Sequence, residues 1–150
     1  MVQSIARLNV HLVFSTKNRQ ALLHESIRAS LHNYIAVVLQ NFGSPAVLIN
    51  SVEDHVHILF DLGRTASVSQ AVEEIKTTSS KWLKTRGPQF VNFAWQTGYA
   101  AFAVSKSNVA AVREYIASQD EHHRKLSFQD EFRAILKRHG LAFDERFIWD

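Results

Sequence analysis

The sequence predicts an α+β fold in which a four-stranded antiparallel sheet carries helices on one face. Four stretches have the alternation or the apolar character of strands, and two longer stretches between them repeat apolar residues at helical spacing. Short polar breaks separate these segments. Their order is strand, helix, strand, strand, helix, strand, which is that of a ferredoxin-like split βαβ sheet. Further helices are expected at the C-terminal end of the chain.

Two different periodicities predict the first strand and the first helix. Residues 5–14 alternate between apolar and polar side chains, as a half-buried strand does. Residues 24–42 place apolar side chains three or four positions apart, and Gly43 provides a C-terminal stop for this helix. The polar face of the strand carries Arg7, Asn9 and His11.

Three further strands complete the predicted sheet, and a second helix lies between the last two of them. Residues 46–52 and 55–61 are the second and third strands, residues 67–84 are a helix that opens with a capping-box pattern, and residues 99–105 are the fourth strand.

Two more helices are expected after the fourth strand. One covers residues 108–122 with Ser107 as its N-cap, and another runs from Ser127 to near Gly140. We treat residues 1–150 as one domain with a core over about 5–123 and an extension over about 124–150. The apolar stripe of the last helix would pack on the sheet or on a partner chain: Phe128, Phe132, Ile135 and Leu136.

Composition narrows the class of protein. The 150 residues are 46% hydrophobic, which is enough for a packed core, and the net charge of +3 tolerates a polyanionic partner. The absence of cysteine excludes disulfides and thiolate metal sites. No apolar run approaches the roughly 18 residues of a membrane span, and the N-terminus lacks the features of a signal peptide. We therefore expect a cytoplasmic protein that works in association with the nucleoid and has no membrane partner.

A histidine pair is the central chemical feature of the sequence. In the split βαβ topology the first and third strands are neighbours, so His55 and His57 should share the open face with the polar side chains of residues 5–14. Side chains two positions apart on a strand lie roughly 6.6–7 Å apart along the chain and can converge on one metal ion. For such a pair taken alone, two partly exposed surface histidines are the simpler interpretation.

A tyrosine and a glutamine form a second pair on the helix after the fourth strand. Tyr115 and Gln119 are four residues apart, so they project from the same side of a helix. Taken alone, they fit a tyrosine at the margin of the core and a solvated amide. His122 and His123 follow one turn later as further ligands or DNA contacts, although solvent exposure is the simpler interpretation for them.

In combination these features resemble the HUH single-strand DNA transposases that carry one catalytic tyrosine, a family of insertion-sequence and repeat-associated tyrosine transposases. The matching segments occur in order and span about residues 5–123. They are the first strand with Thr16-Lys17-Asn18-Arg19, then Glu53-Asp54-His55-Val56-His57, Ile75-Lys76-Thr77-Thr78-Ser79-Ser80, Trp95-Gln96-Thr97-Gly98-Tyr99 and Val112-Arg113-Glu114-Tyr115-Ile116-Ala117-Ser118-Gln119.

The resemblance implies a role for each residue of the two pairs. Tyr115 would be the nucleophile that forms a 5′-phosphotyrosine, and His55, His57 and Gln119 would bind a divalent metal. Two imidazoles and an amide oxygen suit Mg²⁺ or Mn²⁺, and ligand type alone leaves zinc open. The resemblance also implies that the substrate is single-stranded DNA with a hairpin. It further implies a homodimer whose active site is shared, with the histidines of one chain beside the tyrosine helix of the other.

Several side chains are candidates for contacts with the DNA strand, because cationic groups track phosphates. For each of them, scattered surface charge is an equally good explanation. The candidates are Arg7, Asn9, His11, Lys17, Arg19 and Lys76.

Three alternatives to a mobile transposase stay open at this point. One is a domesticated relative that nicks and joins DNA without moving its own gene. A second is a non-catalytic ferredoxin-like module that binds single-stranded nucleic acid. The third is a metal-dependent phosphodiesterase that uses water and does not need Tyr115. A phenol has a pKa near 10, and the sequence identifies no general base for it.

Overall fold

A computed structural model of the protein describes residues 3–146 and 148–150, without the side chains of residues 122–124. Four strands form one antiparallel sheet in the order β2-β3-β1-β4, which confirms the predicted topology. β1 and β3 are neighbours over their whole length, with Val13 opposite His57. The strands are β1 (Asn9–Ser15), β2 (Ala46–Ser51), β3 (His55–Asp61) and β4 (Ala100–Val104).

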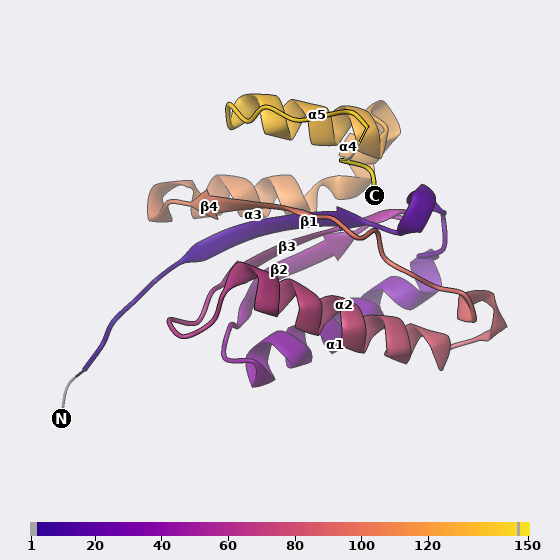
Figure 1. The fold of residues 1–150 in the computed structure, drawn as a ribbon, viewed down its shortest axis with the longest axis horizontal. Coiled ribbons are helices and arrows are strands. Elements are labelled where there is room, and N and C mark those ends of the chain that lie inside the picture. The colour runs from indigo at the N-terminus through magenta and orange to yellow at the C-terminus, as the bar shows by residue number, and fades with distance from the viewer. Residues whose placement is uncertain (1–2, 147) are drawn as a thin grey trace.

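Two long helices cover one face of the sheet, α1 (Glu25–Asn41) and α2 (Val68–Lys84) (Figure 1). The predicted capping box at the start of α2 is present. The Gln70 amide donates to Ser67 Oγ at 3.1 Å, and the Ser67 amide donates to Gln70 Oε1 at 2.9 Å. Fully buried side chains of both layers fill the space between these helices and the sheet, among them Leu12, Phe14, Leu31, Ile35, Ile58, Phe60 and Ile75.

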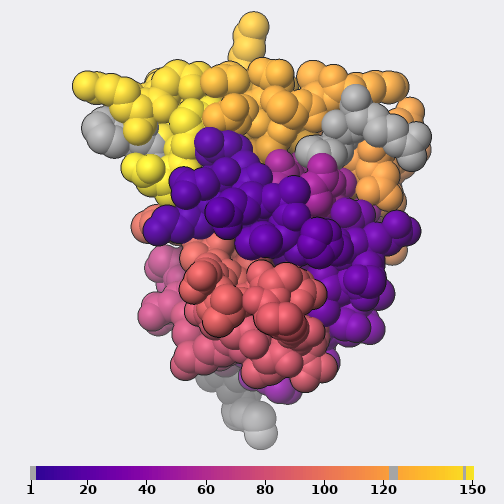
Figure 2. All heavy atoms as spheres, turned by 90° about the vertical axis from the view of Figure 1, so that its right-hand side faces the viewer, coloured from indigo at the N-terminus to yellow at the C-terminus, as the bar shows by residue number. Residues whose placement is uncertain are grey.

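The other face of the sheet is covered as well, so the expectation of an open polar face is wrong. α3 (Val109–Ala117), α4 (Gln119–Lys125) and α5 (Phe128–Arg138) lie on it, opposite α1 and α2 (Figure 1). In Figure 2 these C-terminal segments, orange to yellow, lie directly against the first segment of the chain, in indigo. The apolar stripe of α5 explains this cover, because it forms a second core with the sheet: Val13, Ala100, Phe102, Phe128, Phe132, Ile135 and Leu136.

The predicted helix over residues 108–122 is divided into two. α3 ends before Ser118, whose φ of −95° and ψ of 20° are not helical, and α4 begins at the next residue. Two side-chain hydrogen bonds stabilise the break, one from β2 and one from Ser118 itself. Asn50 Nδ2, on β2, donates to the carbonyl of Ile116 at 2.8 Å, and Ser118 Oγ donates to the carbonyl of Glu114 at 2.9 Å. The predicted N-cap is also wrong, since Asn108 rather than Ser107 precedes α3.

Short 3-10 turns make three of the remaining connections: η1 (Lys17–Arg19), η2 (Pro88–Phe90) and η3 (Lys106–Asn108). Within the part of the chain that the structure describes, no helix combines the length and the apolar character that crossing a bilayer demands.

A half-buried histidine between α1 and β2 should make the fold sensitive to acid. His32 Nε2 lies 2.7 Å from Ser51 Oγ, and burial, together with the charge of Arg28, lowers the pKa of His32 to about 4. Between pH 6.5 and pH 4 the unfolded chain therefore takes up a proton that the native state refuses, and stability falls as the pH falls. We expect His32→Gln to reduce this loss by ~1–2 kcal/mol, a figure discounted for the partial exposure of the ring.

Urea unfolding of both proteins at pH 7 and pH 4.5 measures the difference. His24→Gln, at an exposed position, is the matched control and should leave the pH dependence of wild type. An equal pH dependence in wild type and His32→Gln would contradict the assignment.

Candidate metal and nucleophile site

The histidine pair lies at the start of β3, beneath the C-terminal helices, and both side chains are 0% exposed. A second residue holds each imidazole from behind. His55 Nδ1 lies 2.7 Å from Asp54 Oδ1, and His57 Nδ1 lies 2.8 Å from His11 Nε2. Acceptors behind the ring are typical of metal-binding histidines, because they fix the ring orientation and leave Nε2 for the ion.

The tyrosine and the glutamine of the C-terminal helices reach the same place. The ring of Tyr115 lies edge-on to that of His57, with centroids 5.8 Å apart. Gln119 is fully buried, and its Oε1 lies 3.2 Å from His55 Nε2. The break at Ser118 therefore does not separate the two residues from the histidines. One chain by itself brings together all four residues of the two pairs.

Glu131 of α5 is a fifth member of the cluster that sequence reasoning missed. It is 2% exposed. Its Oε1 lies 3.0 Å from His57 Nε2 and accepts a hydrogen bond from the Tyr115 hydroxyl at 2.6 Å, and its Oε2 lies 3.3 Å from His55 Nε2. One signal could have indicated it, because Glu131 is three residues after Phe128 and four before Ile135, within the apolar stripe of the helix.

The charges of the clustered side chains shift one another's pKa values. Burial disfavours the charged form of His55, but hydrogen bonds to Asp54 and Glu131 outweigh burial and raise its pKa to about 9. For Glu131, burial opposes ionisation, yet the two imidazoles hold its pKa well below the usual range. Burial and the Glu131 carboxylate both raise the pKa of Tyr115 above that of a free phenol. In the absence of a metal, the directions of these pKa shifts favour an ionised Glu131, a protonated His55 and a protonated phenol.

The neighbour of His57 is neutral in this arrangement. Burial, reinforced by His57, lowers the pKa of His11 to about 3. A neutral imidazole carries one donor and one acceptor nitrogen. His11 Nε2 is thus able to accept a hydrogen bond from the Nδ1–H of His57. That tautomer of His57 would leave its Nε2 as a ligand.

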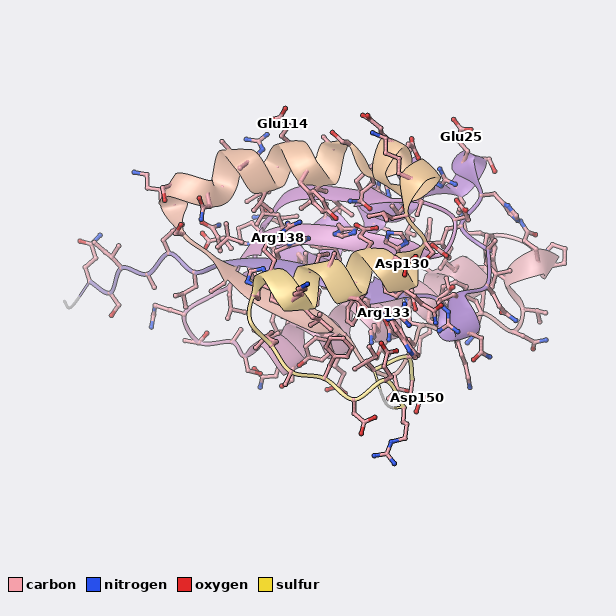
Figure 3. All side chains as sticks on the ribbon, turned by 90° about the horizontal axis from the view of Figure 1, so that it is seen from above. Glu25, Glu114, Asp130, Arg133, Arg138 and Asp150 are labelled. Carbon is pink, nitrogen blue, oxygen red and sulfur yellow. The ribbon has the colours of Figure 1, made fainter. Side chains whose placement is uncertain are left out.

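A cavity of about 350 Å³ lies beside the tyrosine, between α3 and α5. Figure 3 looks down on these two helices, with Asp130 near the start of α5 and Arg138 near its end. The cavity reaches the nucleophile candidate Tyr115 and has cationic and aromatic groups in its wall. Its lining includes His11, Asn108, Tyr115, Arg138 and His139.

The residues suggested for DNA contacts lie in different surroundings. Arg7 is exposed and lies 3.5 Å from Asp61, and Lys17 is exposed on η1. Arg19 lies over the ring of Trp149 at 5.8 Å. Asn9 and His11 are buried beneath the C-terminal helices. The side chains of the two histidines at 122 and 123 lie outside the described residues.

Lys76 has its ammonium group engaged by the backbone. Its Nζ donates to the carbonyls of Gln96, Thr97 and Gly98 at 2.8, 3.2 and 2.7 Å. Burial lowers its pKa to about 8. One helical turn later, Ser79 Oγ accepts a hydrogen bond from Trp95 Nε1 at 2.9 Å. Two of the sequence motifs thus meet in space, and their contacts fix the segment that leads into β4.

Removal of the Lys76 ammonium should therefore reduce stability. We expect Lys76→Met to lower the free energy of unfolding by ~2–3 kcal/mol, because three carbonyls lose a charged donor. Urea denaturation measures the change, and Lys81→Met, at an exposed position of the same helix, should change stability by less than ~0.5 kcal/mol. Wild-type stability in Lys76→Met would show that these hydrogen bonds contribute nothing.

The fold and the site together define a class of protein. A split βαβ sheet with a His-hydrophobe-His strand, against which a tyrosine helix packs, is the arrangement of HUH transposases with a single tyrosine. The chain belongs to the family of IS200-like transposases, because the sequence model of that family matches residues 4–119. The resemblance found in the sequence is thereby confirmed, and the protein is a DNA transposase by family. No curated protein matches the sequence.

Solved structures with the same fold include two transposase-related proteins. One is a candidate transposase from Deinococcus radiodurans R1, with a TM-score of 0.62 and 21% identity over 79% of this chain and 98% of that one. The other is a REP-associated tyrosine transposase bound to a REP hairpin, with a TM-score of 0.61 and 16% identity over 82% of this chain and 74% of that one. At these identities the likeness establishes the fold alone.

Proposed function

We propose that the protein is a metal-dependent transposase that cuts and rejoins single-stranded DNA through Tyr115. The phenol oxygen attacks a phosphodiester, the bond from phosphorus to the 3′ oxygen breaks, and a 5′-phosphotyrosine forms while a free 3′-OH leaves. The observation that carries this proposal is that the tyrosine and the histidine pair contact the same carboxylate. The Tyr115 hydroxyl lies 2.6 Å from a carboxylate that also contacts both histidines of the pair.

Mg²⁺ or Mn²⁺ would be held by His55, His57 and Gln119. The donor set fits such an ion, because two Nε2 atoms and an amide oxygen converge and the two rings are anchored at Nδ1. When bound, the ion supplies positive charge for the non-bridging phosphate oxygens as charge develops on them. Asp54 and His11 hold the imidazoles in orientation throughout.

The covalent intermediate explains why the outcome is joining. One phosphate ester is exchanged for another, so the energy of the bond is retained. A second 3′-OH that enters the site attacks the phosphotyrosine, and the phenol leaves with a proton. The reaction therefore needs no nucleotide cofactor, and cleavage and ligation are the same step in opposite directions.

The proposed substrate is a single strand with a hairpin near the cleavage point, in chromosomal DNA at the nucleoid. The REP hairpin in the structure of similar fold supports this choice. Exposed cations such as Arg7 and Lys17 would contribute salt-dependent phosphate contacts.

A homodimer with a shared site stays a prediction. In the structure, Tyr115 and His57 of the same chain are in contact, so a shared site needs an exchange of α3 between two chains. Mixing Tyr115→Phe and His57→Ala proteins tests this exchange. Recovered activity supports a shared site, and inactive mixtures that contain heterodimers exclude it.

The function itself is tested with labelled, hairpin-bearing oligonucleotides, Mg²⁺ or Mn²⁺, and denaturing gels. The expected product is a protein–DNA adduct that boiling in detergent leaves intact. Cleavage without an adduct would identify a hydrolytic phosphodiesterase. Binding without cleavage, across a panel of hairpins and both metals, would identify a non-catalytic binding module.

A further inference from the structure

Glu131 lies at the centre of the buried cluster although it belongs to none of the sequence motifs. We infer that Glu131 is itself a ligand of the divalent metal and the one acidic ligand in the described part of the site. The inference rests on the proposed function, and it assigns to the last helix a direct part in the chemistry. α5 lies beyond residue 119, where the match to the family ends.

The distances around the carboxylate are those of a ligand set. One ligand atom each from His55, His57 and Glu131 lie within 4.8 Å of one another. Glu131 Oε1 lies 3.0 Å from His57 Nε2, and Glu131 Oε2 lies 3.3 Å from His55 Nε2. Two ligands at right angles on an ion with bonds of ~2.1 Å lie ~3.0 Å apart. An ion that displaces the proton between carboxylate and imidazole would thus fit with little movement of the side chains.

The energetics of burial support the same conclusion. A carboxylate with 2% exposure loses several kcal/mol of hydration, which positively charged partners in the interior must offset. Both of its oxygens face imidazole nitrogens, and the apolar residues of α5 surround it on its own helix. A side chain needed only to dock α5 would be apolar, as the rest of that stripe is.

The same carboxylate also positions the nucleophile. Glu131 Oε1 contacts both His57 Nε2 and the Tyr115 hydroxyl, at 3.0 and 2.6 Å. A ligand that bridges these two groups holds the phenol oxygen next to the ion. It also adds a negative charge to an otherwise neutral set, and this should favour Mg²⁺ and Mn²⁺, which prefer oxygen ligands.

The test measures Mn²⁺ binding to the full chain without DNA, by calorimetry and by the loss of the free-ion electron paramagnetic resonance signal. We expect Glu131→Gln, which keeps the shape and removes the charge, to weaken binding at least ~10-fold, and Glu131→Ala to weaken it at least ~100-fold. Glu121→Gln is the matched control, because Glu121 is an exposed glutamate paired only with Lys125 at 3.4 Å among the described residues. It should bind Mn²⁺ as wild type does.

The shift in melting temperature on addition of Mn²⁺ separates ligation from a structural role. The inference requires that added Mn²⁺ raise the melting temperature of wild type and Glu121→Gln and raise that of Glu131→Gln less. Wild-type Mn²⁺ affinity in Glu131→Gln would overturn the inference, as would a wild type that binds no Mn²⁺. The adduct assay is independent: if wild type binds Mn²⁺ through Glu131 but forms no adduct, the proposed transposase function fails and the metal site stands.

Discussion

Replacement of Tyr115 with phenylalanine is expected to abolish the covalent protein–DNA adduct, with a loss of at least ~10³-fold in the rate of strand cleavage. Phenylalanine keeps the ring that packs edge-on to His57 and removes only the hydroxyl. No phosphotyrosine can form without that oxygen, whatever else in the site is intact. Denaturing gels measure the adduct, and fluorescence anisotropy measures hairpin binding, which should change by less than ~3-fold.

Tyr34→Phe is the matched control for this variant. Tyr34 lies on α1, on the opposite face of the sheet, where it stacks on Trp82 with ring centroids 5.0 Å apart. It should form adduct at the wild-type rate. An adduct that survives in Tyr115→Phe would show that another residue is the nucleophile, and cleavage that survives without an adduct would show that water is.

The second large effect is expected for His57→Ala. Loss of this ligand should weaken Mn²⁺ binding at least ~100-fold and slow adduct formation ~10²- to 10³-fold. Removal of metal from wild type with EDTA should produce a similar loss of activity, restored by excess Mn²⁺. The variant also deprives buried Glu131 of one partner, so we expect the metal-free protein to lose ~2–3 kcal/mol of stability.

Two measurements distinguish ligation from simple destabilisation. High Mn²⁺ concentrations should partly restore the activity of His57→Ala if the imidazole is a ligand. His32→Ala, which removes a half-buried histidine from the other side of the sheet, should lose stability but keep wild-type Mn²⁺ affinity. Full adduct formation by His57→Ala in the presence of EDTA would exclude a metal-dependent reaction.

Most of the fold was predictable because the patterns that define strands and helices lie within a few neighbouring residues of the sequence. β3 occupies His55–Asp61 as predicted, and α2 begins at its capping box. The side of the sheet that each residue faces also followed from alternation, since His55 and His57 do lie on the face of His11. These features depend on period, caps and turn residues, all of which the sequence displays.

The features that the sequence did not predict depend on contacts between distant segments. The break at Ser118 is stabilised by Asn50 of β2, 66 residues away from its acceptor Ile116, and no local signal marks such a bond. The second face of the sheet is covered because α5 packs against β1 and β4, and the sequence did not predict that contact. Glu131 was missed for the same reason, although its place within an apolar stripe marks a charge that must find partners in the interior.

The cover that α5 places over the histidines has a chemical consequence for the strand-transfer reaction. β1 is buried along its full length, as are six of the seven residues of β3, and Tyr115 beside them is half-buried. The linkage would therefore form where bulk solvent has reduced access. Charges interact more strongly in such surroundings than at the surface. A DNA end esterified there is shielded from loss to water, and the hydroxyl of an incoming strand becomes its main competitor for the phosphate.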